Sequence, residues 1–123
     1  MNQSEAAYAH VLTSVDVVVL TLVKGVLSVV LVQRIHAPFA GVWALPGGYI
    51  HADEDADAHA SAMRVLHTKA GIDGAYLEQL ATFTGPARDP RGWSVAIAYC
   101  ALIPQERLPT QRTGLKIVPV NAP

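Results

Sequence analysis

Hydrophobic and polar positions follow two patterns along the chain, and the first of them indicates β-structure. Residues 15–32 are almost continuously apolar and rich in valine, which favours strands over a helix. Lys24 and Gly25 interrupt this run and are typical of a tight hairpin turn, so we expect strands at 15–23 and 26–33. A transmembrane segment is the alternative for so apolar a run, but the charged residues within it favour the hairpin.

The stretch 43–72 changes to a helical pattern. Its apolar beginning ends in a Pro-Gly-Gly turn, and an acidic loop follows in which Asp53 and Asp55 are alternative N-caps for a helix. Apolar residues then recur at helical spacing, at Ala56, Ala60, Met63, Leu66 and Ala70. The pattern predicts a helix of about four turns, which Gly71 ends as a left-handed C-cap.

Strands are predicted again beyond the helix. The expected elements are a strand from Leu77, a polar loop at 87–92, a strand at 94–103, a polar loop at 105–114 and a last short strand at 115–120. Gly85 and Pro86 mark the end of the first of these strands. No helical pattern follows the last strand.

Length and composition indicate one packed domain, at residues 13–123, after a tail at 1–12. Of the 123 residues, 51% are hydrophobic and 15% are charged, which is typical of a globular fold. The formal net charge of −1 gives no electrostatic case for binding nucleic acid or an anionic membrane. The single cysteine, Cys100, excludes an internal disulfide, and the first residues lack the pattern of a secretory signal, so we expect a cytoplasmic setting.

The glycine turn, acidic loop and helix at 47–72 resemble the signature of the Nudix hydrolases, G-x5-E-x7-R-E-U-x-E-E-x-G-U, where U is aliphatic. Gly48, Glu54, Arg64 and Gly71 match fixed positions of this signature. Glu54 and Arg64 are separated by two residues more than in the standard pattern. This spacing and the acidic run resemble a branch related to the regulators of NAD metabolism, and the resemblance extends over nearly the whole chain.

The resemblance implies an α/β fold, a Nudix-like α/β/α sandwich with a mixed, partly antiparallel sheet. Segment 115–120 resembles the family segment that leads into a closing C-terminal helix, yet no helix follows, so we expect this helix to be lacking. Either the chain has been cut, or it is naturally short and another subunit, as in a homodimer, covers the apolar sheet surface. A DNA-binding domain would come next in the regulator-like branch, so we expect no nucleic-acid or membrane partner for this chain alone.

Three glutamates on the family's helix hold Mg²⁺, which bridges to the substrate phosphates. The corresponding positions here are Val65, Thr68 and Lys69, and none of them is a carboxylate. The resemblance therefore implies Mg²⁺ as the cofactor, while this helix lacks the ligands for it. Asp53 and Glu54 are weak candidates for a cation site, but helix capping is the favoured interpretation of the acidic loop.

Six residues are candidates for contact with a ligand: Arg34, Gly47, Gly48, Lys69, Arg88 and Arg91. By resemblance, the basic residue that ends the second strand faces ligand phosphates. The ammonium of Lys69 would supply a positive charge to a diphosphate without Mg²⁺. Solvated surface side chains are the alternative interpretation for the charged candidates. Glu54 is a candidate to pair with Arg64 and hold the acidic loop onto the helix.

Three functions are compatible with this pattern. The first is a Nudix domain that binds nucleoside diphosphate-linked metabolites such as ADP-ribose, with weak or absent hydrolysis. The second is a metal-dependent pyrophosphatase that uses carboxylates outside the signature, for which Glu78 and Glu106 are available. The third is a non-catalytic sensing or interaction module of a transcriptional regulator. Whether the chain is an enzyme therefore stays open at this point.

Overall fold

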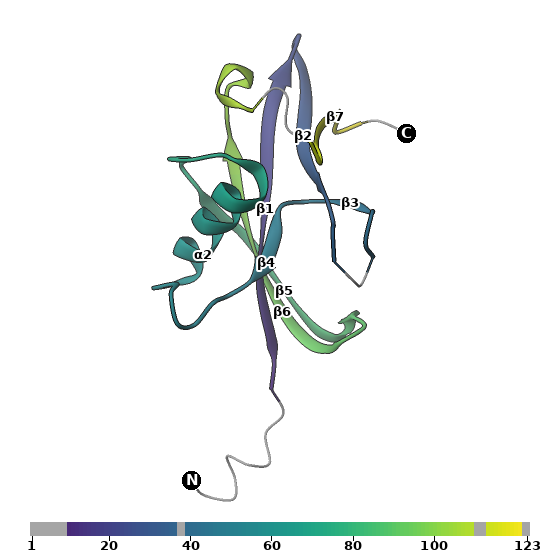
Figure 1. The fold of residues 1–123 in the computed structure, drawn as a ribbon, viewed down its shortest axis with the longest axis vertical. Coiled ribbons are helices and arrows are strands. Elements are labelled where there is room, and N and C mark those ends of the chain that lie inside the picture. The colour runs from purple at the N-terminus through teal and green to yellow at the C-terminus, as the bar shows by residue number, and fades with distance from the viewer. Residues whose placement is uncertain (1–9, 37–38, 110–112, 122–123) are drawn as a thin grey trace, which may run out of the picture.

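A mixed sheet of seven strands forms the body of the protein, with a short helix packed on one face (Figure 1). The structure is a computed structural model that describes residues 10–36, 39–109 and 113–121. The strands are β1 (Leu12–Val23), β2 (Val26–Gln33), β3 (Trp43–Ala44), β4 (Gly47–Tyr49), β5 (Glu78–Asp89), β6 (Gly92–Leu102) and β7 (Leu115–Pro119). The strand order is β3-β2-β1-β6-β5, with β4 added to β1 and β7 to β2. Only the β1–β6 pair is parallel among these described pairings, so the predicted α/β class with a mixed, partly antiparallel sheet is confirmed.

The predicted hairpin at the start of the chain is confirmed as β1 and β2. Lys24 (φ 49°) and Gly25 (φ 79°) both adopt left-handed backbone angles, as a two-residue turn between twisted strands requires. Val23 therefore pairs with Val26 directly across the turn. No helix within the described part of the chain is long and apolar enough to cross a membrane.

The predicted helix is present, although its beginning differs from the prediction. It consists of α2 (Ala58–Val65) and a π-helical turn, η1 (Leu66–Ala70), and Gly71 ends it at φ 70° as expected. Its N-cap is Asp57, whose Oδ1 accepts a hydrogen bond from the Ala60 amide at 2.7 Å. The prediction of Asp53 or Asp55 as the cap was wrong because the helix begins later and Asp55 binds another partner.

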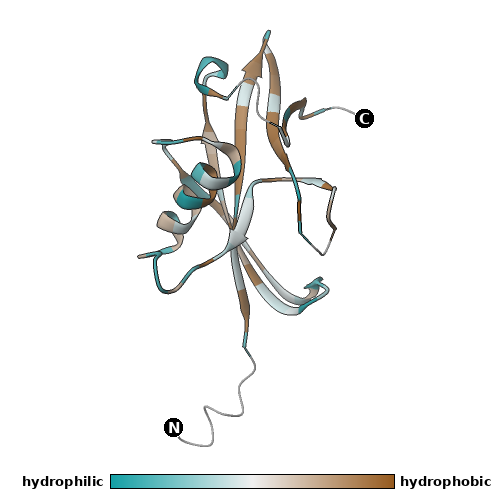
Figure 2. Ribbon diagram, in the orientation of Figure 1, coloured by the Kyte–Doolittle hydropathy of each residue, from teal (hydrophilic) through white to brown (hydrophobic). Residues whose placement is uncertain are grey.

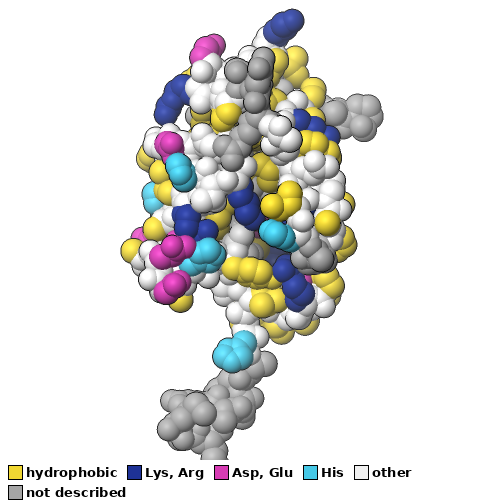
Figure 3. Space-filling model, in the orientation of Figure 1, with side chains coloured by type: hydrophobic (Ala, Val, Ile, Leu, Met, Phe, Trp, Pro, Cys, Tyr) yellow, Lys and Arg dark blue, Asp and Glu magenta, His cyan; other side chains and the backbone are white. Residues whose placement is uncertain are grey.

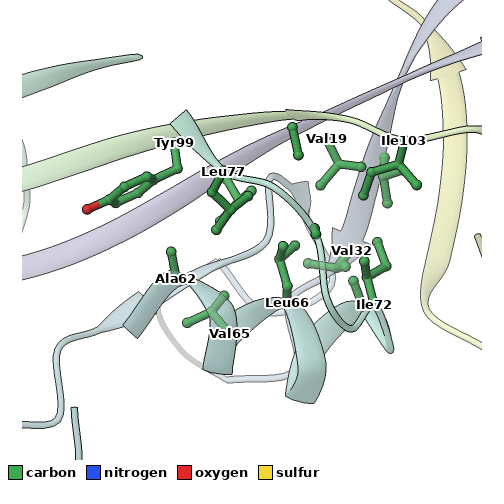
Figure 4. Packing of buried hydrophobic residues seen from close by; sticks show 14 of the residues in the cluster. Val19, Val32, Ala62, Val65, Leu66, Ile72, Leu77, Tyr99 and Ile103 are labelled. Atoms are coloured by element: carbon green, nitrogen blue, oxygen red, sulfur yellow. The ribbon is translucent and has the colours of Figure 1, made fainter. Parts of the chain in front are cut away.

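The helix packs against the sheet through one apolar face, and the spacing of apolar residues predicted only some of the residues on that face. Ala62, Val65 and Leu66 are fully buried and point toward side chains of β1 and β6, as Figure 4 shows. Ala56, by contrast, is exposed. Along β1 the alternate residues Val15, Val17 and Val19 supply the opposite wall of this core. Figure 2 shows the hydrophobic strands beside the hydrophilic loop that precedes α2.

The hairpin of β5 and β6 is longer than predicted. Strand β5 continues through Gly85 and Pro86 to Asp89, so the turn is reduced to residues 90–91. The predicted strand end was wrong because β5 lies at the edge of the sheet, where a proline interrupts no ladder bond on the outer side. Pairing with β6 is irregular between Gly85 and Asp89, which accommodates the two residues.

The face of the sheet away from α2 is apolar and open within the described part of the chain. Leu22, Leu27, Phe83 and Leu102 lie on this face by strand register and are 55%, 44%, 50% and 70% exposed. The only α-helix among the described residues, α2, covers the opposite face. The described structure thus has one helical layer, and no described helix closes the second face.

Candidate ligand-binding site

A cavity of about 390 Å³ lies where β2 and β4 separate along β1. Both strands pair with the same edge of β1, β2 at residues 20–23 and β4 at residues 14–16, so a gap opens between them. The end of β2 and the residues after it form one wall, and Leu45 and Gly47 form another. Thr68 and Lys69 of the π-helical turn complete the lining together with residues 113–114. Lys, Arg and His side chains gather on this side of the molecule, between α2 and β3 (Figure 3).

Lys69 is fixed against the glycine turn. Its Nζ donates a hydrogen bond to the carbonyl oxygen of Gly47. The same nitrogen lies only 3.5 Å from the point that a Cβ on Gly48 would occupy. Partial burial lowers the pKa of Lys69, and the neighbouring charges of Arg34 and Arg64 lower it further, while Asp16 opposes this effect. An ammonium among other cations and partly removed from water favours the approach of an anion.

The structure brings together three of the predicted ligand-contact residues in the cavity lining, Arg34, Gly47 and Lys69. Gly48 is adjacent, since it follows Gly47 in β4 and a Cβ at this position would contact Lys69. The cavity also includes Gln33, His36 and Thr113, which carry no distinctive sequence signal. They belong to the site because the end of β2 and the segment before β7 lie side by side in the fold. The backbone N–H of Gln33 donates a hydrogen bond to the Gly114 carbonyl there.

Arg88 and Arg91 do not line the cavity, and both have partners elsewhere. Arg88 Nη1 donates to Ser94 Oγ at 3.0 Å, and its guanidinium lies 5.9 Å from the Phe83 ring centre. Arg91 forms an ion pair with Asp89 at 2.6 Å and lies 4.9 Å from the ring centre of Tyr49. Both arginines were expected in a polar loop at 87–92; Arg88 lies instead in β5 and Arg91 in the turn, and their contact with a ligand stays a prediction.

The acidic loop is tied to the helix chiefly by Asp55. Arg64 Nε and Nη2 donate to the two Asp55 carboxylate oxygens at 2.9 and 3.0 Å, and Nη2 also donates to the Tyr49 carbonyl at 2.9 Å. Glu54 is a secondary partner, 3.5 Å from Arg64 Nε, and its side chain is 54% exposed against 3% for Asp55. The Arg64 guanidinium holds the pKa of Asp55 far below its usual range. The expected Glu54–Arg64 contact therefore exists, but the bidentate anchor is the next residue.

The donor set at the signature positions does not fit Mg²⁺. Val65 is fully buried in the core, Lys69 carries a positive charge, and Thr68 donates its hydroxyl to the Arg64 carbonyl at 3.0 Å. Of the weak candidates in the loop, Glu54 contacts His51 and Arg64, and Asp53 is exposed. Within the described ranges no three His, Cys, Asp or Glu side chains are grouped closely enough to hold a metal ion. Mg²⁺ requires several oxygen ligands, so these residues offer it no site.

Asp16 is a neighbour of the cavity that the sequence did not single out. It pairs with Gly47 across β1 and β4, and a Cβ on Gly47 would collide with its carboxylate. Burial raises the pKa of Asp16, and the charges of Arg88, Lys69 and Arg34 oppose this rise. The only signal in the sequence is a lone acidic residue inside a valine-rich strand. Burying a carboxylate costs free energy unless cations lie nearby, so an acidic residue in such a strand indicates positive charges around it.

The fold and the glycine turn beside its helix are those of a Nudix domain. Residues 12–120 match the model of the NUDIX domain, and the chain therefore belongs to the Nudix family.

Three proteins of known name or structure are similar to this chain. The ADPR responsive transcriptional repressor NtrR of Acinetobacter baylyi is 44% identical over 96 residues, which are 78% of this chain and 38% of that protein. The ADP-ribose pyrophosphatase of Methanocaldococcus jannaschii is 28% identical over 92 residues, 75% of this chain and 51% of that protein. The NUDIX domain of Shewanella oneidensis NrtR, solved with ADP ribose, is 35% identical with a TM-score of 0.83 over 98% of this chain and 84% of that domain. The chain thus spans about half or less of the curated relatives it matches.

Proposed function

We propose that this domain binds a nucleoside diphosphate-linked metabolite of the ADP-ribose type in the cavity between β2 and β4, without Mg²⁺ and with weak or absent hydrolysis. The observation that carries the proposal is the Lys69 ammonium, hydrogen-bonded to the Gly47 carbonyl at the cavity wall. The similarity to a domain solved with ADP ribose supports the choice of ligand class.

The cavity offers a diphosphate what a metal would otherwise supply. Lys69 and Arg34 place two positive charges in its lining, and charge-assisted hydrogen bonds to phosphate oxygens are about twice as strong as neutral ones. Gly48 has no side chain, which allows the Lys69 ammonium to lie close to β4. A cavity of about 390 Å³ is within the size range of small-molecule sites. Arg88 and Arg91 stay predictions as ligand contacts.

Hydrolysis of a diphosphate requires an activated water, and the helix provides no carboxylate to hold the metal that would activate it. Within the alternative of a pyrophosphatase, Glu78 and Glu106 would have to supply these groups. Glu78 begins β5 and accepts a hydrogen bond from Tyr76 at 3.2 Å, and Glu106 belongs to the short 3₁₀ turn η2 (Gln105–Arg107). Neither lines the cavity, so the geometry favours binding over turnover.

Binding without turnover is the property that a sensory module needs. The similarity to a protein named as an ADPR responsive transcriptional repressor supports this role for the domain, with DNA contacts supplied by regions other than the residues described. The open apolar face of β1, β2, β5 and β6 supports a homodimer that covers it. Light scattering would test the dimer, and a strictly monomeric particle at micromolar concentration would contradict it.

The decisive experiment measures binding and turnover of ADP-ribose in parallel. We expect calorimetric binding that persists in EDTA and is weakened about 10- to 100-fold in Lys69→Ala, because one charge-assisted hydrogen bond is lost. Lys24→Ala is the matched control, since this lysine lies in the exposed β1–β2 turn and its removal changes net charge equally. Rapid, EDTA-sensitive release of AMP would refute the proposal, and so would unchanged affinity in Lys69→Ala.

A further inference from the structure

We propose that Asp16 tunes the charge selectivity of the cavity, because its carboxylate repels nucleotides with an additional terminal phosphate charge more than it repels the doubly charged diphosphate of a diester. This inference rests on the proposed function, because it concerns the same cavity, and it assigns a role to a residue outside the Nudix signature.

The position of Asp16 is fixed by the sheet. The residue lies in the middle of the β1 segment that pairs with β4, with Val15 opposite Gly48 and Asp16 opposite Gly47. Its carboxylate occupies the space that a side chain on Gly47 would need. The carbonyl of the same Gly47 accepts the hydrogen bond from Lys69. The carboxylate and the ammonium therefore both contact Gly47, although they approach β4 from opposite faces, since the next residue, Gly48, faces Lys69.

The charges around Asp16 come from three separate elements. Lys69 belongs to η1, Arg34 follows β2, and Arg88 belongs to β5, and all three act on the carboxylate over distance. Lys69 and Arg34 also line the cavity, whereas Arg88 does not. The lining thus presents two cations to a ligand, and the adjacent carboxylate cancels part of their field.

A partly cancelled field discriminates between ligands by their charge. The repulsion between Asp16 and a ligand grows in proportion to the ligand's negative charge, so ADP and ATP lose more than ADP-ribose does. Burial increases this repulsion, because the carboxylate is only partly screened by water. Asp16 thus reduces the advantage that the two cations alone would give to a more highly charged ligand, and this reduction is a form of selection against competing ligands.

The test compares ADP-ribose, ADP and ATP in EDTA, on the wild type and on Asp16→Asn. We expect Asp16→Asn to tighten binding of all three, with about a threefold larger gain for each additional ligand charge. Asp16→Ser provides a second neutral residue that also fits beside Gly47. Asp73→Asn is the matched control, because Asp73 is 73% exposed, pairs with His67 and does not line the cavity.

The possible failures can be told apart. Equal changes for the three nucleotides, no change, or weaker binding of all three in both neutral variants would overturn the inference, and the last result would make Asp16 a support for Lys69. In each of those cases the binding of ADP-ribose by the wild type would leave the proposed function intact. Absence of any binding by the folded wild type would contradict the proposed function itself and the inference with it.

Discussion

Two basic residues of the helix formed by α2 and η1 differ in how their charges are neutralised. Arg64, in the last turn of α2, meets the Asp55 carboxylate in a bidentate pair and also binds the Tyr49 carbonyl. At the C-terminal end, Lys69 meets a neutral carbonyl and lines a cavity with Arg34. A pair of opposite charges in direct contact has little attraction left for a ligand, whereas a cation held by a carbonyl keeps its charge available. The same helix therefore carries an anchor, the Arg64–Asp55 pair, and a binding surface, which includes Lys69.

The largest effect is expected from Gly47→Ala, which disturbs the strand whose carbonyl binds Lys69. The new Cβ would collide with the Asp16 carboxylate and lie 3.0 Å from the Val15 carbonyl oxygen, so β4 must shift. We expect a loss of about 1–3 kcal/mol in the free energy of unfolding, as for other overpacked positions. Ligand affinity should fall at least as far as in Lys69→Ala, because the carbonyl that holds the ammonium moves.

Urea unfolding and calorimetry would measure these two effects of Gly47→Ala. Gly74→Ala is the control for affinity: Gly74 lies away from the cavity and has φ 67°, so alanine strains the backbone there and lowers stability while the site stays intact. A Gly47→Ala protein with wild-type stability and affinity would show that the contact between β1 and β4 is looser than the structure indicates.

A smaller effect, confined to stability, is expected from Asp55→Asn, which removes the ion pair of Arg64. The folded-state pKa of Asp55 is lowered by Arg64, so its ion pair stabilises the protein above the unfolded-state pKa, about 4, and is lost as the pH falls below that value. Asp55→Asn should lower Tm by about 5 °C at pH 7, and the difference from the wild type should shrink under acid conditions.

Thermal scans between neutral and acid pH would show this convergence for Asp55→Asn. Glu54→Gln is the matched control, because its exposed carboxylate is only a secondary partner of Arg64 and should change Tm less. Affinity for ADP-ribose should change little in either variant. An affinity loss as large as in Lys69→Ala would remove the distinction between anchor and binding surface.

The sequence predicted the elements whose signals are local. The Lys24–Gly25 turn and the Gly71 helix end depend on backbone angles that few residues adopt, so both could be located without the fold. The cap at Asp57 was missed because several acidic residues precede the helix and each fits the pattern of an N-cap. Asp55 does not cap the helix because its carboxylate binds Arg64, which is nine positions later in the sequence.

The candidate site was predicted only as far as the family signature reaches. Gly47 and Lys69 lie within it, and the resemblance also pointed to Arg34 at the end of β2. Asp16 has no such marker, since its significance comes from pairing with Gly47 thirty-one positions later in the chain. The extent of β5 was also misjudged, because Pro86 ends a strand only where its missing donor is needed, and an outer edge does not need it.

The π-helical turn Leu66–Ala70 has a consequence for comparing this domain with its relatives. A π turn forms hydrogen bonds from residue i to residue i+5, so it contains more residues than an α-helical turn and changes the direction in which its side chains project. The contact of Lys69 with the Gly47 carbonyl therefore depends on the winding of this turn as well as on the residue type. Alignment of the letters alone cannot transfer this contact; the winding of the last turn has to be known as well.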